Sequence, residues 1–246
     1  MAAPASVPGA RPVLITRPGA SAEAEIAALA LLGVPAIAAP LTRIEPVLPR
    51  PPVPAEAQAL IFTSAEAVAP MAEDPVARRL PAYCVGPRTR AAAAAAGFAA
   101  ADGPAPGDVA ALGERLQSAP ETHFHHAAGR HVAGDLAAAL APVGKSVTRS
   151  TVYEAVPLPI SEAVRAALAT GGIAAVGLWS ARHAAFFAEA CHAEAWPLGA
   201  TDAVAISDKA AAPLSGLGFR EVVVAPTPDG DTMRRLLATA AGRSGA

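Results

Sequence analysis

Short apolar runs recur along the chain, and an alanine-rich or amphipathic stretch separates each run from the next. Glycine, proline or serine bounds most of the runs, which is typical of buried strands. The pattern predicts strands at Pro12–Thr16, Val34–Ala39, Ala59–Thr63, Ala82–Val85, His123–His126, Ser146–Tyr153, Ala174–Trp179, Ala203–Ile206 and Arg220–Ala225.

The stretches between these runs have helical spacing. In the first of them Ile26, Leu29 and Leu32 fall on one face, and Glu23 and Glu25 are expected in the first turn. Strand and helix alternate throughout, which predicts an α/β fold with parallel sheets covered on both faces. The helices are expected over Ser21–Leu32, after Ser64, over Thr89–Gly97 and Gly107–Gln117, through Leu136 and Leu140 to Gly144, over Ser161–Ala169, from Ser180 to Ala190, up to Gly216 and over Gly230–Ala241.

The two halves of the chain resemble each other. Residues 17–46 align with residues 128–157 at an offset of 111, which matches Gly33 with Gly144 and Pro46 with Pro157. Further on, FTSAEAV at 62–68 resembles LWSARHA at 178–184, and the stretch 83–98 resembles 204–219. A slowly increasing offset is what a duplication with small loop insertions produces, so we expect an internal duplication.

Two extended segments hold matching places in the repeat, PLTRIEP at 40–46 and TVYEAVP at 151–157. Each ends on a proline, and we expect them to run side by side as two antiparallel linker strands between two lobes. Residues 1–41 and 158–246 would then form a discontinuous α/β domain, and 46–150 an inserted one. The functional site is expected in the cleft that the linker strands span.

Length, charge and cysteine content argue against several classes of function. The chain has 246 residues, enough for two domains, and a formal net charge of −2, so it lacks the basic excess typical of nucleic-acid binders. Cys84 and Cys191 have no CxxC spacing and are expected to be buried free thiols. The sequence shows neither a signal-peptide pattern nor a run of about 18 apolar residues, so we expect a cytoplasmic protein without a membrane partner.

Several segments resemble the uroporphyrinogen-III synthase family over almost the whole chain: VLITRP (13–18), IFTSAEAV (61–68), CVGPRTRAA (84–92), VYEAVP (152–157) and LWSARHAAFF (178–187). The resemblance implies two flavodoxin-like lobes joined by a two-stranded linker. It implies a lyase that closes the linear tetrapyrrole hydroxymethylbilane to uroporphyrinogen III, with loss of water and inversion of ring D. It also implies no cofactor or metal, and a monomer that receives its substrate from hydroxymethylbilane synthase.

The substrate of that family carries eight carboxylates. In open α/β sheets, ligands bind beyond the carboxyl ends of the strands, where helix N-termini present free N–H groups. The candidate substrate-binding residues at these ends are Arg17, Ser64, Gly86, Thr89, Gly129, Arg130, Ser180, Ser207 and Lys209. Ser64, Thr89 and Ser180 can equally be plain helix N-caps, and the two roles are compatible.

Tyr153 matches the tyrosine that the family places near the cleft, and it is the candidate acid that assists departure of the hydroxyl. The alternative is a structural tyrosine of the linker strand. The sequence departs from the family pattern at Glu66, where asparagine is common, and at Ser207-Asp208-Lys209-Ala210, where glycine and threonine are usual. Arg130 follows Gly129, whereas the family often has an arginine before that glycine.

Four histidines, at 123, 125, 126 and 131, suggest a metal site at first sight. No carboxylate or cysteine stands at a useful spacing, so a solvated or cleft-edge strand is expected instead. Two other functions stay open. A catalytically silent protein of the same fold could bind a tetrapyrrole or a small anion, whereas the missing signal pattern opposes a periplasmic-type solute binder.

Overall fold

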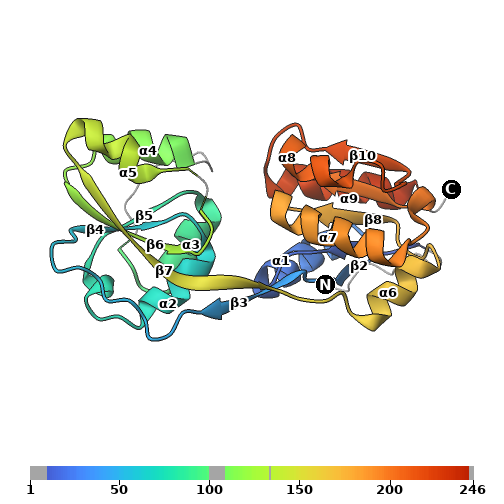
Figure 1. The fold of residues 1–246 in the computed structure, drawn as a ribbon, viewed down its shortest axis with the longest axis horizontal. Helices are drawn as coiled ribbons and strands as arrows, with labels where there is room; N and C mark the ends of the chain where they lie inside the picture. The colour runs from blue at the N-terminus through green and yellow to red at the C-terminus, as the bar shows by residue number, and fades with distance from the viewer. Residues whose placement is uncertain (1–9, 100–108, 133, 244–246) are drawn as a thin grey trace. The chain divides into compact units, whose positions relative to one another are not determined.

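The computed structural model describes residues 10–99, 109–132 and 134–243. The chain divides into two compact units, unit 1 (residues 1–43 and 156–246) and unit 2 (residues 44–155). Each unit has its own five-stranded sheet with helices on both faces, so the protein has an α/β fold with two mainly parallel sheets (Figure 1). No helix within the described ranges has the length and apolar character needed to cross a membrane.

The sheet of unit 1 has the strand order β10-β9-β8-β1-β2, and every neighbouring pair is parallel. Its central strands are buried, as expected of a parallel sheet covered on both faces. The strands are β1 (Val13–Ile15), β2 (Ala36–Ala38), β8 (Ala175–Leu178), β9 (Asp202–Ala205) and β10 (Glu221–Val224). All five were predicted, four with slightly wider bounds and β9 one residue too late, over 203–206.

Helices α1 (Gly19–Leu31) and α9 (Gly230–Gly242) cover one face of this sheet. The other face packs against α6 (Glu162–Ala169), α7 (Ala181–Glu194) and α8 (Asp208–Ala211), which Figure 1 labels, and against η5 (Ala212–Leu214). The short helix η4 (Leu198–Ala200) leads into β9. Cys191 is buried as a free thiol, as expected.

Two predictions about α1 are wrong, and both errors concern its ends. The helix begins at Gly19, so Glu25 lies beyond its first turn, and no acidic residue stands in that turn. Leu32 is the C-cap, with 57% of its surface exposed, because the chain turns away at Gly33 with a φ of +72°. Leu29 alone of the predicted apolar face is fully buried.

The sheet of unit 2 has the order β3-β7-β6-β4-β5, and the pairs from β7 to β5 are parallel. The strands are β3 (Thr42–Pro46), β4 (Ala59–Phe62), β5 (Ala82–Cys84), β6 (His123–Gly129) and β7 (Ser146–Pro157). The predicted strand 146–153 and the predicted segment 151–157 are one continuous strand, β7, of 12 residues.

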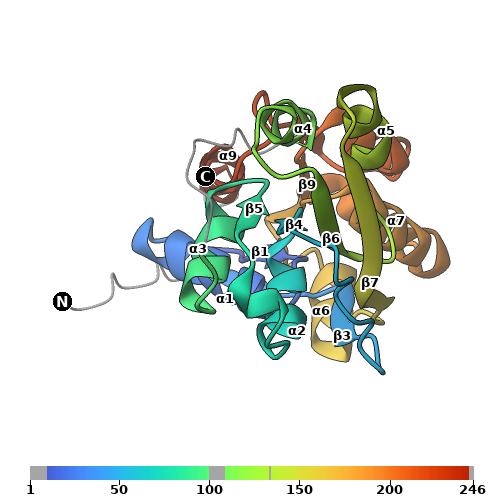
Figure 2. The same cartoon turned by 90° about the vertical axis from the view of Figure 1, so that its left-hand side faces the viewer.

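Two groups of helices cover this sheet (Figure 2). One face packs against η1 (Ala65–Ala67), α2 (Val68–Ala72), η2 (Ala77–Arg79) and α3 (Pro87–Ala95). The other face packs against α4 (Val109–Gln117) and α5 (Leu136–Leu140), which η3 (Ala141–Val143) follows. The helix predicted over 107–117 is found from Val109 onward, and its first two residues lie outside the described residues. Cys84 is buried and free, as expected.

Candidate functional site

Each sheet has one place where the strand order reverses. In unit 1 the chain steps outward from β1 to β2, and from β8 in the opposite direction to β9 and β10. In unit 2 it steps from β4 to β5 and, on the other side, from β6 to β7. The crevice beyond the carboxyl ends of the two strands at such a switch point is where open α/β sheets bind ligands. Arg17 and Ser180 follow the switch-point strands of unit 1; Ser64 and Gly129 hold the corresponding places in unit 2.

In unit 2, the ring of Tyr153 lies directly on Gly129. The two residues are register partners on β7 and β6, just after an irregularity in the pairing. A Cβ atom on Gly129 would come within 2.6 Å of the Cζ atom and 2.9 Å of the hydroxyl oxygen of Tyr153. Glycine is therefore required at this position for the ring to take its place at the end of β6.

The Tyr153 hydroxyl forms a hydrogen bond with Ser64, the residue that follows β4 by two positions. Ser64 also caps η1, because its Oγ accepts from the backbone N–H of Glu66 at 3.3 Å. Burial raises the pKa of Tyr153 above its ordinary value; the Ser64 hydrogen bond lowers it by less, and the Glu66 carboxylate raises it further. The phenol therefore keeps its proton at neutral pH and can act as a hydrogen-bond or proton donor.

Buried histidines lie in the strand next to this site. His126 Nε2 is 2.9 Å from Thr63 Oγ1, and burial, helped by the charge of Arg149, lowers its pKa to about 4. Burial also lowers the pKa of His125, whose Nδ1 lies 2.9 Å from Thr148 Oγ1.

Of the solvated or cleft-edge strand predicted for the histidines, the solvated alternative is wrong at these two positions, because His125 and His126 are buried. His123 and His131 are exposed, as expected. No group of three metal-ligating side chains occurs in the described part of the chain.

The other predicted residues of unit 2 differ in burial and in the contacts that they make. Gly86 is the N-cap of α3, and Thr89 is buried within that helix, so the alternative of Thr89 as the N-cap is wrong. Arg130 is exposed, and its Nε lies 2.6 Å from Glu154 Oε1. Glu66 forms an ion pair with Arg88 at 3.0 Å.

In unit 1, Arg17 lies over the indole ring of Trp179, with its Cζ 5.5 Å from the ring centroid. The Trp179 ring lies across Gly177, where an added Cβ would come within 2.5 Å of a ring carbon. Arg17 Nη1 is also 3.3 Å from Glu25 Oε1, and the other oxygen of Glu25 is 3.0 Å from Arg234 Nε. An arginine and an aromatic ring thus stand together at the switch point.

Ser180 caps α7, because its Oγ accepts from the backbone N–H of His183 at 3.1 Å. The N-cap alternatives for Ser64 and Ser180 are thus confirmed. His183 Nε2 lies 3.1 Å from the hydroxyl of Thr42, the first residue of β3. Burial, followed by the charges of Arg182 and Arg17, lowers the pKa of His183 to about 4, so its imidazole is neutral at neutral pH.

Ser207 and Lys209 lie beyond β9, one strand away from the switch point. Ser207 is the N-cap of the four-residue helix α8, but its side chain makes no capping hydrogen bond. Lys209 is exposed on that helix. These two residues stand apart from the Arg17 and Ser180 pair in the strand order of the same unit.

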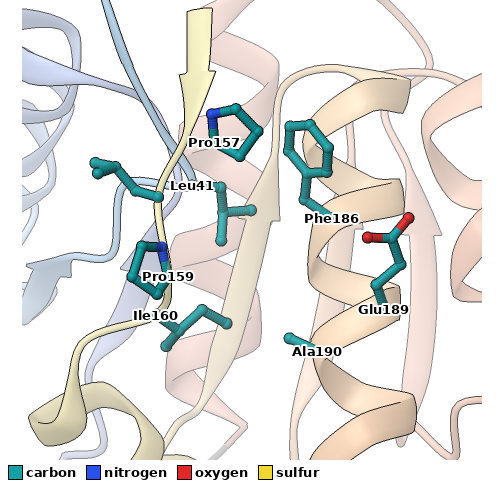
Figure 3. Close-up of a pocket in the computed structure, with 8 residues that line it drawn as sticks. Leu41, Pro157, Pro159, Ile160, Phe186, Glu189 and Ala190 are labelled. Carbon is teal, nitrogen blue, oxygen red and sulfur yellow. The ribbon is translucent and has the colours of Figure 1, made fainter.

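Each unit also has an apolar cavity that none of the predicted binding residues lines. In unit 1 a cavity of about 360 Å³ lies between α7, which contributes Phe186, Glu189 and Ala190, and the segment from Pro157 to Ile160, with Leu41 beside it (Figure 3). In unit 2 a cavity of about 470 Å³ has walls that include Glu66, Arg50 and Glu73. Both cavities are lined mainly by apolar side chains.

Sequence reasoning therefore named Tyr153, Ser64 and Gly129, which the structure brings together in unit 2. It did not predict that they are neighbours, and it missed Trp179, His183 and Thr42 in unit 1. A tryptophan at the carboxyl end of an apolar run was the available signal for Trp179, since the chain has only two tryptophans. No comparable signal marked Thr42, because its partner His183 is 141 residues away in the sequence.

Comparison with known proteins gives a consistent result. Residues 23–234 match the family model described as uroporphyrinogen-III synthase HemD. The crystal structure of a uroporphyrinogen-III synthetase from Helicobacter pylori 26695 is similar to this chain with a TM-score of 0.64 at 18% identity, over 93% of this chain and 99% of that one.

A second solved structure, a mutant uroporphyrinogen III synthase from the extremely thermophilic bacterium Thermus thermophilus, has a TM-score of 0.53 at 21% identity. The match covers 95% of this chain and all of that one (100%). At these identities the two structures support the fold. No curated protein matches the sequence.

Proposed function

We propose that this chain, which belongs to the uroporphyrinogen-III synthase family, converts hydroxymethylbilane to uroporphyrinogen III. The family model, matched over residues 23–234, is the observation that carries the proposal. Membership of the family makes the chain an enzyme of tetrapyrrole biosynthesis. In finer terms, we propose a lyase that releases water, closes the macrocycle and inverts ring D.

The chemistry requires conformational control and modest acid assistance. Departure of the ring-A hydroxyl leaves an azafulvene cation that the pyrrole stabilises, and in water this species closes without inversion. The protein must hold the bilane so that ring D attacks through its substituted carbon, after which the spiro intermediate opens and recloses. Positioning of this kind is a recognised source of rate and selectivity, and it needs no cofactor or metal.

Tyr153 is the proposed acid. Its hydroxyl is protonated at neutral pH and lies at the unit 2 switch point, fixed by Gly129 and Ser64. Because a phenol is a weak acid, its contribution to the rate should be about one to two orders of magnitude. The proposed carboxylate ligands remain Arg17, Ser64, Gly86, Thr89, Gly129, Arg130, Ser180, Ser207 and Lys209.

We also propose that the two units are flavodoxin-like and arose by duplication. One domain would comprise residues 1–41 and 158–246, and the other residues 46–150. Segments 40–46 and 151–157 would be the antiparallel linker strands between these domains. Two backbone hydrogen bonds support the antiparallel sense: Val47 N–H donates to Val152 O at 3.0 Å, and Leu158 N–H donates to Leu41 O at 2.9 Å. Residue numbers rise along one segment while they fall along the other. A cytoplasmic monomer that receives its substrate from hydroxymethylbilane synthase completes the proposal.

A product analysis tests the reaction directly. Hydroxymethylbilane is generated in situ, the protein is added, and the oxidised uroporphyrin isomers are separated by chromatography. We expect isomer III to predominate, whereas isomer I alone at the rate without enzyme would reject the synthase and favour a silent binding protein. In the same assay Tyr153→Phe should lower turnover by about 10- to 100-fold; unchanged turnover would make Tyr153 structural.

A further inference from the structure

Arg17 and Trp179 occupy equivalent places at the end of neighbouring strands. Ile15 on β1 is the register partner of Gly177 on β8, and Arg17 and Trp179 each follow these partners by two positions. The pair therefore stands at the carboxyl edge of unit 1, at the switch point where the strand order reverses. A ligand bound at this edge would meet both side chains together.

The indole ring is fixed in position before any ligand arrives. It lies across Gly177, packs against the core formed with α1 and α9, and has the Arg17 guanidinium 5.5 Å from its centroid. An arginine stacked on an aromatic face keeps its plane, so less freedom is lost when it binds an anion. Trp179 therefore orients Arg17.

Trp179 also has a polar group that the fold does not use. Its Nε1 is buried, and no acceptor for it exists among the described residues. Buried donors without partners are rare in native proteins, and their occurrence needs an explanation. The residue as a whole remains partly exposed beside Arg17, although its Nε1 atom is buried.

The ion pairs around Arg17 allow its guanidinium to take a new anionic partner. Glu25 faces both Arg17 and Arg234, and the Arg234 contact is the shorter, at 3.0 Å against 3.3 Å. Glu25 would therefore stay paired when Arg17 turns to a ligand. The nearby His183 is neutral at neutral pH and adds no competing charge.

We propose that Arg17 and Trp179 form a carboxylate subsite for the acidic side chain of a pyrrole ring, in which Trp179 positions Arg17 and donates its indole N–H as a second hydrogen bond. The identity of the substrate rests on the proposed function. The subsite itself requires only a ligand that combines a carboxylate with a flat ring. A planar guanidinium and an adjacent N–H suit the two oxygens of one carboxylate.

Intrinsic fluorescence can test binding without catalysis, because the chain has two tryptophans. Trp196 is only 8% exposed and packs in the core beside Phe187. Trp196→Phe leaves Trp179 as the reporter, and Trp179→Phe leaves Trp196. The probe is porphobilinogen, a single pyrrole with one acetate and one propionate, and its dimethyl ester is the matched control.

We expect porphobilinogen to change the fluorescence of Trp196→Phe in a saturable way, and the ester and the Trp179→Phe variant to give no such response. Far-ultraviolet circular dichroism checks that both variants are folded. An unchanged signal in folded Trp196→Phe, in a protein that still makes isomer III, would overturn the subsite and leave the proposed function intact. A saturable response without isomer III would support the subsite and reject the function.

Kinetics separate the two roles of Trp179. Trp179→Phe keeps an aromatic platform but loses the N–H, and should raise KM about tenfold with kcat nearly unchanged. Trp179→Leu loses both and should raise KM further. Phe186→Leu is the matched control, because Arg182 stacks on Phe186 at 5.3 Å on the same unit's α7. A normal KM for Trp179→Phe would overturn the hydrogen-bonding role, and a normal KM for Trp179→Leu would also overturn the positioning role.

Discussion

The two units use the same device at their switch points, an aromatic ring laid over a glycine, but they present different chemistry. In unit 2 the ring is Tyr153 on Gly129, and it ends in a hydroxyl bound to Ser64. In unit 1 the ring is Trp179 on Gly177, and Arg17 covers it. Unit 2 thus offers a protonated phenol, and unit 1 a cation beside an N–H donor.

The origin of each ring explains the difference. Tyr153 reaches Gly129 from the neighbouring strand β7, whereas Trp179 directly follows β8, the strand that contains Gly177, and its ring folds back over that glycine. At the proposed offset of 111 residues the counterpart of Tyr153 is Thr42, a short side chain that contacts His183 instead of a serine. In the proposed roles, unit 2 donates a proton and unit 1 binds an anion.

The largest effect should come from filling the two glycine positions. Gly129→Ala forces the Tyr153 ring away, so kcat should fall by about 10- to 100-fold, and unit 2 should lose about 1–3 kcal/mol of stability. Gly177→Ala displaces Trp179 instead and should raise KM more than it lowers kcat. Steady-state kinetics of both variants measure kcat and KM, and urea unfolding measures the change in stability. Equal losses of kcat in the two variants would break the proposed division of roles.

The buried histidines should give a pH dependence of stability. The folded-state pKa of His126, about 4, lies below its unfolded value of about 6.5, so its contribution is complete above pH 6.5 and is lost as the pH falls toward 4. Unit 2 should lose about 2 kcal/mol between pH 7 and pH 5 from this residue. His126→Gln should reduce that loss, measured by urea unfolding with circular dichroism.

His183 provides the parallel test in unit 1, because its pKa is also lowered to about 4. Both tryptophans, Trp179 and Trp196, belong to unit 1, so their fluorescence reports unfolding of that unit. The fluorescence transition should keep its pH dependence in His126→Gln and lose part of it in His183→Gln. The reverse pattern would contradict the assignment of each histidine to its own unit.

Much of the fold followed from local patterns. Parallel strands buried on both faces produce short apolar runs, so β1, β4 and β8 were visible as VLI, ALIF and AVGL. Helix ends were less predictable, because a start at Gly19 depends on tertiary packing of α1 rather than on a capping side chain. The buried His125 and His126 were missed because polar residues in a central strand carry no periodic signal.

The candidate site was predictable where strand ends and helix caps coincide. Ser64 and Ser180 each follow an apolar run and begin a helix, so their position could be derived from sequence alone. The partners across the sheet could not be predicted, because they depend on the strand order. Tyr153 meets Ser64 only when β7, β6 and β4 lie next to one another, and Arg17 meets Trp179 only when β1 and β8 are adjacent.

The hydroxyl of Thr42 should matter more than that of Thr148, although each is hydrogen-bonded to a histidine. Thr42 is only 1% exposed, so Thr42→Val leaves the His183 nitrogen without water and should cost about 1–2 kcal/mol. Thr148 is exposed, and water can replace its hydroxyl in Thr148→Val. Urea unfolding of the two variants compares them, and an equal cost would show that burial does not distinguish the two contacts.

The two capping serines should differ in turnover and only slightly in stability. Ser64→Ala and Ser180→Ala each remove a cap and should cost about 1 kcal/mol. Ser64 also lowers the pKa of Tyr153, so its removal raises that pKa further and makes the phenol a weaker acid. Ser64→Ala should therefore reduce kcat by about threefold to tenfold, while Ser180→Ala leaves kcat near normal and affects only KM. If both variants kept a normal kcat, the Tyr153–Ser64 hydrogen bond would have no role in proton donation, and the functional difference between the units would rest on Arg17 and Trp179 alone.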